Sequence, residues 1–163
     1  MNNDDPGPGS PETDPPDVIA HPPLILLGFI AVGLLANQFY ALPFVSGNAR
    51  YVTGAVLAAL PFFITALAMR EMGKAGTNID VRKPATALIT GSIYSLTRNP
   101  MYLSMVLMLA AGAFLLNNLW LLIAVPIFVA VIQKGVILRE EAYLENKFGA
   151  EYTAYKSRVR RWL

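Results

Sequence analysis

The sequence predicts an all-α, polytopic membrane protein with about four transmembrane helices and a C-terminal amphipathic helical segment. Hydrophobic residues make up 55% of the 163 residues and charged residues only 15%. The apolar residues gather in four runs, none of which contains Asp or Glu: 24–45, 51–69, 101–116 and 119–138. A helix of ~20 apolar residues crosses the ~30 Å hydrocarbon core of a bilayer. As a soluble protein, the chain would have four helices that are apolar on every side and too little polar surface.

Residues 1–20 precede the first run and predict a disordered tail, because they are rich in proline and acids and have no aromatic side chain to bury. Residues 21–163 then form a single membrane domain. The run 24–45 is too long for a signal peptide and lacks a basic segment before it. Turn-forming residues predict a short hairpin between the first two runs: Pro43, Ser46, Gly47 and Asn48. Asn117 and Asn118 predict a tighter hairpin between the last two.

The polar parts of the domain are the loop 70–99 and the tail 139–163. In the tail, aromatic and apolar residues recur at spacings of four and three, which places them on one face of a helix that either lies on the membrane or packs over the loop. These residues are Phe148, Tyr152, Tyr155, Val159 and Trp162. Gly149 is expected to divide this helix into two segments.

Lys and Arg are concentrated in the same loop and tail, which predicts that both are cytoplasmic. The loop has Arg70, Lys74, Arg82, Lys83 and Arg98, the tail has Arg139, Lys147, Lys156, Arg158, Arg160 and Arg161, and the connections between the other runs have only Arg50. With an even number of spans, the N-terminus is cytoplasmic as well. Basic residues beside apolar spans fit a juxtamembrane pattern, so the net charge of +2 does not indicate a nucleic-acid partner.

The content of Cys and His excludes several kinds of site. The chain has no cysteine, which excludes thiol nucleophiles, disulfides and zinc–thiolate or iron–sulfur centres. Its one histidine, His21, lies beside Pro22 and Pro23 before the first span. Neither a histidine metal cluster nor an imidazole triad is therefore expected, and no metal is predicted.

The stretch "SLTRNPMYLSM", residues 95–105, places polar residues directly before an apolar run. Asn99 and Pro100 fit the start of a helix, because Asn is a favoured N-cap and proline a favoured first helical residue. Arg98 does not fit, since a cation beside a helix N-terminus opposes the helix dipole. Either Arg98 reaches a lipid phosphate, or it and the helix terminus together hold an anionic group of a ligand.

Glu140 and Glu141 directly follow the last apolar run. Arg139 and Lys134 offer an ordinary ion-pair cluster, but acids at a membrane boundary that face a helix bundle are also functional candidates. A site with an arginine, a helix N-terminus, tyrosines and a carboxylate pair suits a zwitterionic, nucleoside-bearing cofactor.

The segments "TALITGSIYSLTRNPMYL" and "EEAYLENKFGAEYTAYKSRVRRWL" resemble the isoprenylcysteine carboxyl methyltransferase and phospholipid methyltransferase family of membrane enzymes, which use S-adenosylmethionine. The resemblance covers residue 86 to the C-terminus. It implies methyl transfer to a lipid or prenylated acceptor that enters between helices at the cytosolic face. It also implies these cofactor-binding residues: Thr86, Ala87, Leu88, Ile89, Tyr94, Asn99, Pro100, Met101, Tyr102 and Glu140.

Transfer of an already activated methyl group mainly requires alignment of donor and acceptor and exclusion of water. We assign Arg98 to the orientation of an anionic group, and Glu141 to the acids that can take a proton from an ammonium acceptor. The acceptor stays open among a prenylated thiol or carboxylate, a phospholipid amine and a small lipophilic thiol. Carboxyl methyltransferases of the family have an arginine near the substrate at the position of Val136.

Two other functions remain in consideration. Membrane sterol reductases resemble the same C-terminal region, which suggests a nicotinamide-dependent reductase, although no glycine-rich dinucleotide motif is present. The other is a non-enzymatic four-span protein, such as a transporter or an interaction partner. The lack of an acid within any span disfavours a proton-coupled transporter.

Overall fold

The computed structural model describes residues 19–78 and 83–163, so most of the expected tail 1–20, and Arg82, lie outside the described residues. Regular structure in the described part is entirely helical, which confirms the predicted fold class. Five α-helices, a 3₁₀ helix and a π-helical turn follow one another in the chain: α1 (Pro22–Phe39), α2 (Ala49–Ala75), the 3₁₀ helix (Ser92–Ser95), α3 (Pro100–Leu115), α4 (Leu119–Ile132), the π turn (Gln133–Ile137) and α5 (Leu138–Arg158).

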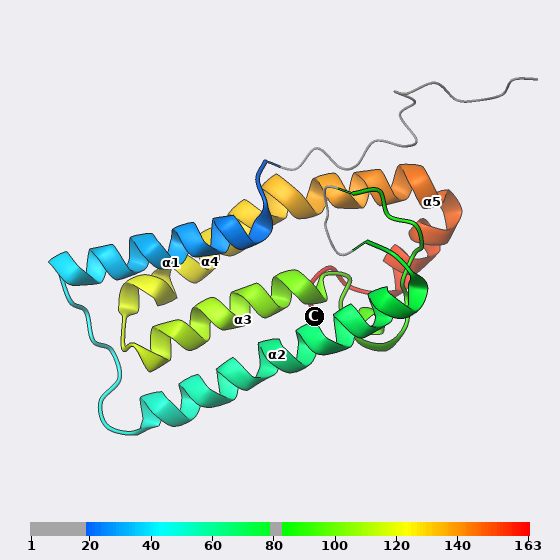
Figure 1. Ribbon diagram of the computed structural model, residues 1–163. Coiled ribbons are helices and arrows are strands. Elements are labelled where there is room, and N and C mark those ends of the chain that lie inside the picture. Colours follow the sequence, from blue (N-terminus) through cyan, green and yellow to red (C-terminus); the bar gives the residue numbers. More distant parts are fainter. Residues whose placement is uncertain (1–18, 79–82) are drawn as a thin grey trace, which may run out of the picture.

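Helix α3 is the centre of the bundle, with α2 along one side and α1 and α4 along the other (Figure 1). α2 and α3 approach closely at Gly54, where an added Cβ would lie 2.6 Å from Cγ of Leu115. Buried leucine, isoleucine and phenylalanine side chains of α3 and α4 form the core, while α1 and α2 expose large apolar side chains such as Val32 and Phe62. Such outward apolar faces are those of helices surrounded by lipid. The protein is therefore a membrane protein.

Among the described residues, three helical segments are long and apolar enough to cross a membrane: α1, α2 and the segment Leu119–Arg158, while α3 is a shorter apolar helix. α1 ends at Phe39 instead of continuing to residue 45 as the run 24–45 suggested. The extended link after it is held by the turn between α3 and α4, because the backbone N–H groups of Phe44 and Val45 donate to Oδ1 of Asn117 at 3.0 and 2.9 Å. α2 continues to Ala75, beyond the expected start of the loop at residue 70, and ends at Gly76 with φ 64°.

The last apolar run continues through the π turn into α5 as one helix up to Gly149. At ~1.5 Å per residue, residues 119–148 extend over ~45 Å, which is longer than the ~30 Å of a bilayer core. The first part of this helix, up to Leu138, has the length and composition of a membrane-spanning helix, and charged residues become frequent after that point. Gly149, at φ 51° and ψ −122°, interrupts α5, so the expected division into two segments is confirmed.

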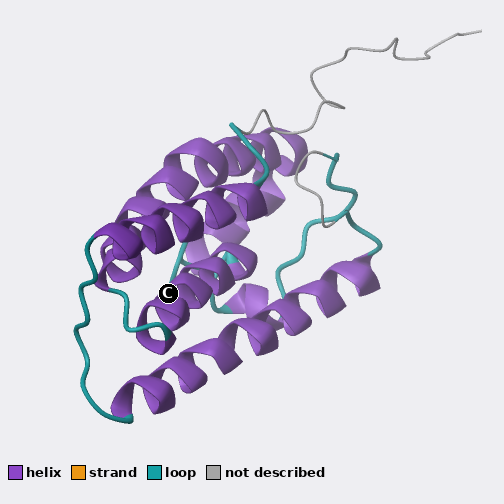
Figure 2. Ribbon diagram, turned by 60° about the vertical axis from the view of Figure 1, so that its left-hand side comes forward, coloured by secondary structure: helices purple, strands orange, loops and turns teal. Residues whose placement is uncertain are grey.

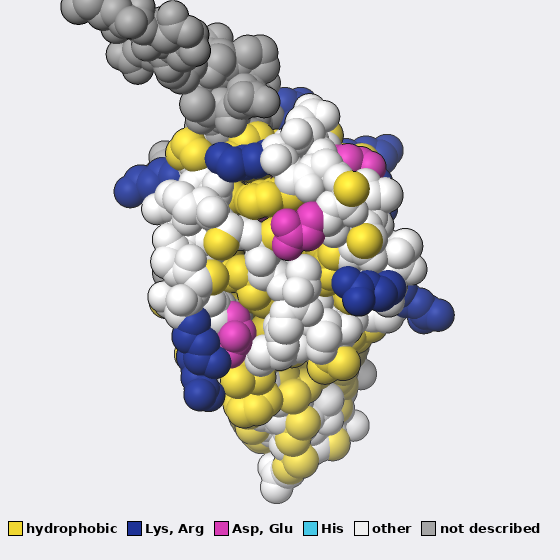
Figure 3. Space-filling model, turned by 90° about the vertical axis from the view of Figure 1, so that its right-hand side faces the viewer, with side chains coloured by type: hydrophobic (Ala, Val, Ile, Leu, Met, Phe, Trp, Pro, Cys, Tyr) yellow, Lys and Arg dark blue, Asp and Glu magenta, His cyan; other side chains and the backbone are white. Residues whose placement is uncertain are grey.

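One end of the bundle is polar. This end comprises the end of α2, the loop that follows it (Figure 2), the start of α3 and helix α5. Figure 3 looks onto this end and shows Lys and Arg side chains around it, with acidic side chains between them. The predicted basic loop and tail thus share one end of the molecule, which also has the two cavities described below.

Candidate functional site

The loop before α3 is held in an irregular conformation by helix α5. Ser92 has φ 55°, a left-handed conformation that costs a non-glycine residue roughly 1–2 kcal/mol. It opens the 3₁₀ helix in which Tyr94 lies, and the hydroxyl of Tyr155 donates to the backbone oxygen of Tyr94 at 2.6 Å. The Tyr94 ring is 8% exposed, and burial raises the pKa of its hydroxyl, which is therefore a neutral donor. Tyr152 and Tyr155 are buried as well, so this face of the tail packs over the loop.

The C-terminal segment 159–163 passes under the start of α3. The N–H of Arg98 donates to the oxygen of Arg160 at 3.0 Å, and both Thr97 Oγ1 and Asn99 Nδ2 donate to the oxygen of Arg161, at 3.1 and 3.0 Å. Pro100 begins α3 as expected, and Asn99 is at the N-cap position. The side chain of Asn99 makes no capping hydrogen bond, however, so the expected cap is wrong in this respect: its amide fastens the C-terminal segment instead.

A buried ion cluster joins α3, α5 and the C-terminal segment. Arg161 makes two hydrogen bonds to Glu141, at 2.9 and 2.8 Å, and Nη2 of Arg98 lies 3.2 Å from Oε1 of the same carboxylate. The side chains of Arg98 and Glu141 are each 8% exposed. The hydrogen bond to Glu141 raises the pKa of Arg161. The structure thus gives Glu141 two arginine partners, Arg98 and Arg161, that the sequence analysis did not suggest for it.

Glu140 lies on a different side of α5 and contacts α3. Its Oε2 accepts a hydrogen bond of 2.7 Å from the hydroxyl of Tyr102. Burial raises the pKa of the Glu140 carboxyl, although the hydrogen bond from Tyr102 acts in the opposite direction. A carboxylate held in this way can bind a cation or accept hydrogen bonds from hydroxyl groups.

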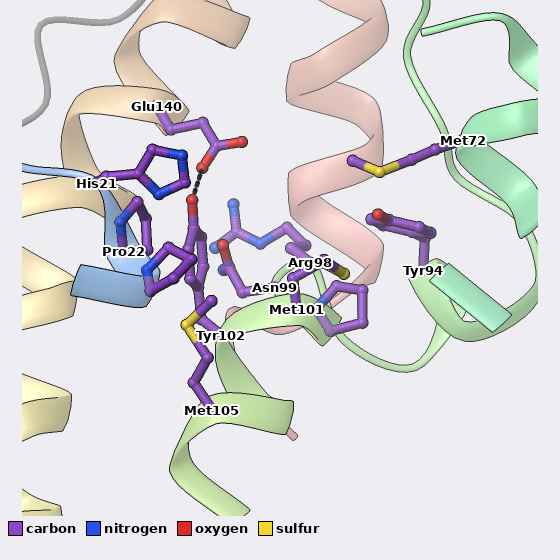
Figure 4. A pocket seen from close by; sticks show the side chains of 12 residues that line it. His21, Pro22, Met72, Tyr94, Arg98, Asn99, Met101, Tyr102, Met105 and Glu140 are labelled. Atoms are coloured by element: carbon purple, nitrogen blue, oxygen red, sulfur yellow. Dashed lines mark hydrogen bonds between the residues drawn. The ribbon is translucent and has the colours of Figure 1, made fainter. Parts of the chain in front are cut away.

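Two cavities meet at these residues. The larger, of about 330 Å³, is mostly apolar and lies between the start of α1, the end of α2 and the start of α3 (Figure 4). Its volume falls at the lower end of the ~300–1,000 Å³ typical of small-molecule sites. The smaller, of about 90 Å³, lies between the loop and α5. Five residues line both cavities: Met72, Tyr94, Arg98, Asn99 and Glu140.

The structure brings together all but one of the residues predicted for the site. Besides the shared residues, Pro100, Met101 and Tyr102 line the larger cavity, and Ala87, Leu88, Ile89 and Glu141 line the smaller. Thr86 lines neither, and its hydroxyl instead donates to the backbone oxygen of Gly76 at 3.0 Å.

Sequence reasoning missed the wall of the larger cavity that α1 and α2 supply: His21, Pro22, Pro23 and Met72. It also missed Met105 in α3, and Tyr152 and Tyr155, which line the smaller cavity. One signal could have found His21. An even number of spans puts both ends of the domain on the same side of the membrane, and therefore places His21 at the same membrane face as the motif around Asn99.

Three buried polar side-chain atoms have no hydrogen-bond partner among the described residues: His21 Nδ1, Tyr94 Oη and Arg98 Nε. All three belong to residues that line the larger cavity. Buried polar groups are normally paired, so orphaned groups around one cavity indicate a polar ligand or water there. The polar groups around the cavities are of the kinds that suit a zwitterionic nucleoside cofactor: a carboxylate, an arginine and phenol hydroxyls.

Comparison with known proteins identifies the family. A family model described as phospholipid methyltransferase matches residues 49–151. The chain belongs to the phospholipid methyltransferase family. Membership indicates a membrane methyltransferase, and the matched segment runs from the start of α2 to α5, without α1 or the C-terminal segment.

An uncharacterized protein of Haemophilus influenzae is 52% identical over 63 residues, which are 39% of this chain and 100% of that protein. No solved structure matches the chain.

Proposed function

We propose that the protein transfers a methyl group from S-adenosylmethionine to a lipophilic acceptor at the cytoplasmic face of the membrane. The observation that supports this most strongly is the pair of adjoining cavities, one apolar and one more polar, which are lined mostly by residues of the family-matched segment 49–151 and share Tyr94, Asn99 and Glu140. The family supports methyl transfer in general terms. The cluster of Lys and Arg at the same end of the bundle supports a cytoplasmic location.

The residues between and around the cavities are the proposed binding groups. Glu140 would bind a cationic or hydroxyl group of the cofactor, while the unpartnered Tyr94 hydroxyl is available as a donor. Ala87, Leu88 and Ile89 would line the cofactor from the loop, as the family resemblance implies. When bound, S-adenosylmethionine supplies an activated methyl group, so the chain does not need a nucleophile of its own.

The chain itself must align the acceptor and exclude water. Met72, Met101 and Met105 make the larger cavity apolar, which suits the alkyl part of a lipid and keeps water away. Correct positioning of two reactants lowers a barrier by ~7–11 kcal/mol in favourable cases. Such alignment requires a rigid loop before α3, and the hydrogen bonds that Thr97 and Asn99 donate to the C-terminal segment would restrain it.

Arg98 and Glu141, the residues first considered for catalysis, are assigned here to positioning. Each is engaged in the buried ion cluster, and Glu141 has both of its carboxylate oxygens bonded to Arg161. The Nε of Arg98 has no partner among the described residues and stays available to an anionic group in the cavity. The pair would therefore set the position of the loop and orient that group.

Calorimetric titration of the detergent-purified protein tests the proposal. S-adenosylmethionine and its demethylated product should bind, and Glu140→Gln should weaken binding at least tenfold, since hydrogen bonds to charged groups contribute ~1.5–3 kcal/mol. Glu151→Gln is the matched control, because Glu151 lies in the same helix but is exposed. NADPH is titrated in parallel to test the reductase alternative. A folded protein that binds neither adenosyl ligand would refute the proposal, and binding of NADPH instead would favour a reductase.

A further inference from the structure

His21 lines the larger cavity. Neither the family match nor the proposed function assigns a role to this residue. It is the only histidine in the chain, and it lies outside the matched segment 49–151. It occupies the N-cap position of α1, where Ser, Thr, Asp and Asn are favoured, yet its side chain makes no capping hydrogen bond. Helix stability therefore does not account for this side chain.

The backbone holds His21 from both sides. Before it, the N–H of Ile19 donates to the backbone oxygen of Gly135 at 3.2 Å. The Ile19 side chain packs directly against Gly135, in the space that a Cβ at position 135 would occupy. After it, Pro22 restricts the backbone, and the N–H of Leu24 donates to the oxygen of His21 at 2.9 Å. The segment that positions the imidazole thus packs against the π turn at Gly135.

The imidazole lies on the same side of the cavity as Glu140 and Tyr102, opposite Met72 and Tyr94 (Figure 4). Its Nδ1 is buried and has no hydrogen-bond partner among the described residues, and because His21 lines the cavity, we infer that a ligand bound there is the missing partner. Imidazole is the side chain best suited to gain and lose a proton near neutral pH.

The other titratable or charged groups of the cavity wall are Glu140, Tyr102, Tyr94 and Arg98. Glu140 favours a cationic or neutral acceptor over an anionic one, because like charges in a buried site repel. Arg98 has an unpartnered Nε, but Glu141 already compensates the charge of its guanidinium group, so Arg98 does not outweigh Glu140 in favour of an anionic acceptor. The position at which carboxyl methyltransferases have an arginine is Val136, which is fully buried in the core and contributes no cation.

We propose that His21 is a catalytic residue that takes the proton of the acceptor through Nδ1, and that the acceptor atom is an ammonium nitrogen or a thiol sulfur in an apolar molecule. This inference rests on the proposed function. The acceptor's N–H or S–H bond breaks, and its proton moves to Nδ1. The electron pair left on the acceptor atom forms the bond to the methyl carbon, and the pair of the broken carbon–sulfur bond stays with the sulfur of the cofactor. The imidazolium then returns its proton to water.

Nuclear magnetic resonance of the full-length protein tests the assignment without any reaction. With ¹⁵N-histidine label and a purification tag free of histidine, the only imidazole signals are those of His21. In the neutral ring the proton should be on Nε2, with Nδ1 free to accept, and dodecylamine should shift the Nδ1 resonance. A neutral ring with its proton on Nδ1, or a resonance that saturating dodecylamine leaves unchanged, would overturn the proposal.

Methylation of three amphiphiles with the same chain length tests the chemistry. His21→Asn keeps a hydrogen-bonding group near the position of Nδ1 but cannot accept a proton. It should bind S-adenosylmethionine as the wild type does and should lower kcat for dodecylamine or dodecanethiol roughly 10²–10⁴-fold at neutral pH. Alkaline pH should restore the rate, since the acceptor then loses its proton to water.

Dodecanoate needs no base and is expected not to be methylated. Methylation of dodecanoate alone, or an unchanged rate in His21→Asn, would overturn the assignment of His21 while leaving the proposed function intact. Loss of cofactor binding in the wild type would instead refute the proposed function, and the resonance measurement would still decide whether Nδ1 faces a ligand.

Discussion

Replacement of Glu141 by glutamine should strongly destabilise the fold, because this carboxylate is buried and has two arginine partners. Glu141 is the single carboxylate that compensates two guanidinium groups, Arg98 and Arg161, within the buried cluster. The substitution preserves size and shape but removes the negative charge. Arg98, with a side chain only 8% exposed, would then be a buried cation that has lost its counterion.

The magnitude follows from the burial of the three side chains. Removal of one partner from a buried ion pair costs ~3–5 kcal/mol. Arg161 is 30% exposed and can turn to solvent, which places the expected loss for Glu141→Gln at the lower end, about 3 kcal/mol. Glu145→Gln makes the same chemical change in the same helix, but the Lys156–Glu145 pair is 38% and 42% exposed. It should cost less than ~1 kcal/mol.

Equilibrium unfolding in mixed detergent micelles, followed by tryptophan fluorescence, measures both variants. Trp162 is a local reporter, because its Nε1 donates to Oε1 of Gln133 at 2.9 Å and so ties the C-terminal segment to the π turn. Glu141→Gln should lower the free energy of unfolding and loosen this contact. Equal stabilities of the Glu141→Gln and Glu145→Gln variants would refute the view that the cluster holds the site together.

Three further predictions concern packing, capping and pH. Asn118→Ala should cost ~1–3 kcal/mol in thermal unfolding, because its buried side chain caps α4 and donates to the oxygen of Gly33 at 3.0 Å; an unchanged melting temperature would contradict this. Gly54→Ala should cost ~1–3 kcal/mol by pushing α2 from α3. Gly28→Ala, with open space around the new methyl group, should be neutral or stabilising by up to ~1 kcal/mol in the same assay. Binding of S-adenosylmethionine should weaken as pH falls through the raised pKa of Glu140, since protonation removes its charge, and calorimetry should show this loss at higher pH than for an exposed glutamate.

Much of the fold was predictable because segments that lie in lipid must be apolar, so the hydropathy of the sequence indicates where they are. Runs of apolar residues identified the helices, and Gly149 identified the interruption of α5. The ends of helices were less predictable, since they depend on contacts between segments far apart in the chain. α1 ends at Phe39 in part because Asn117, beyond α3, binds the link that follows it.

The resemblance of one stretch of sequence to a known family suggested Tyr94, Pro100 and Tyr102 as site residues, and the structure places all three in the wall of the larger cavity. Contacts with distant parts of the chain were less predictable. The partners of Glu141 could not be identified, because Arg98 and Arg161 approach it only after the C-terminal segment folds under α3. A capping propensity likewise did not reveal that the Asn99 amide binds this segment.

Transfer of labelled methyl from S-adenosylmethionine into organic-extractable lipid is the most direct test of the central claim. The purified full-length protein, reconstituted in vesicles of a total lipid extract, should label a lipid fraction, and Glu140→Gln should reduce the label strongly while Glu151→Gln does not. The absence of labelled lipid from a folded wild-type sample, across vesicles that contain amine and thiol amphiphiles, would contradict the account.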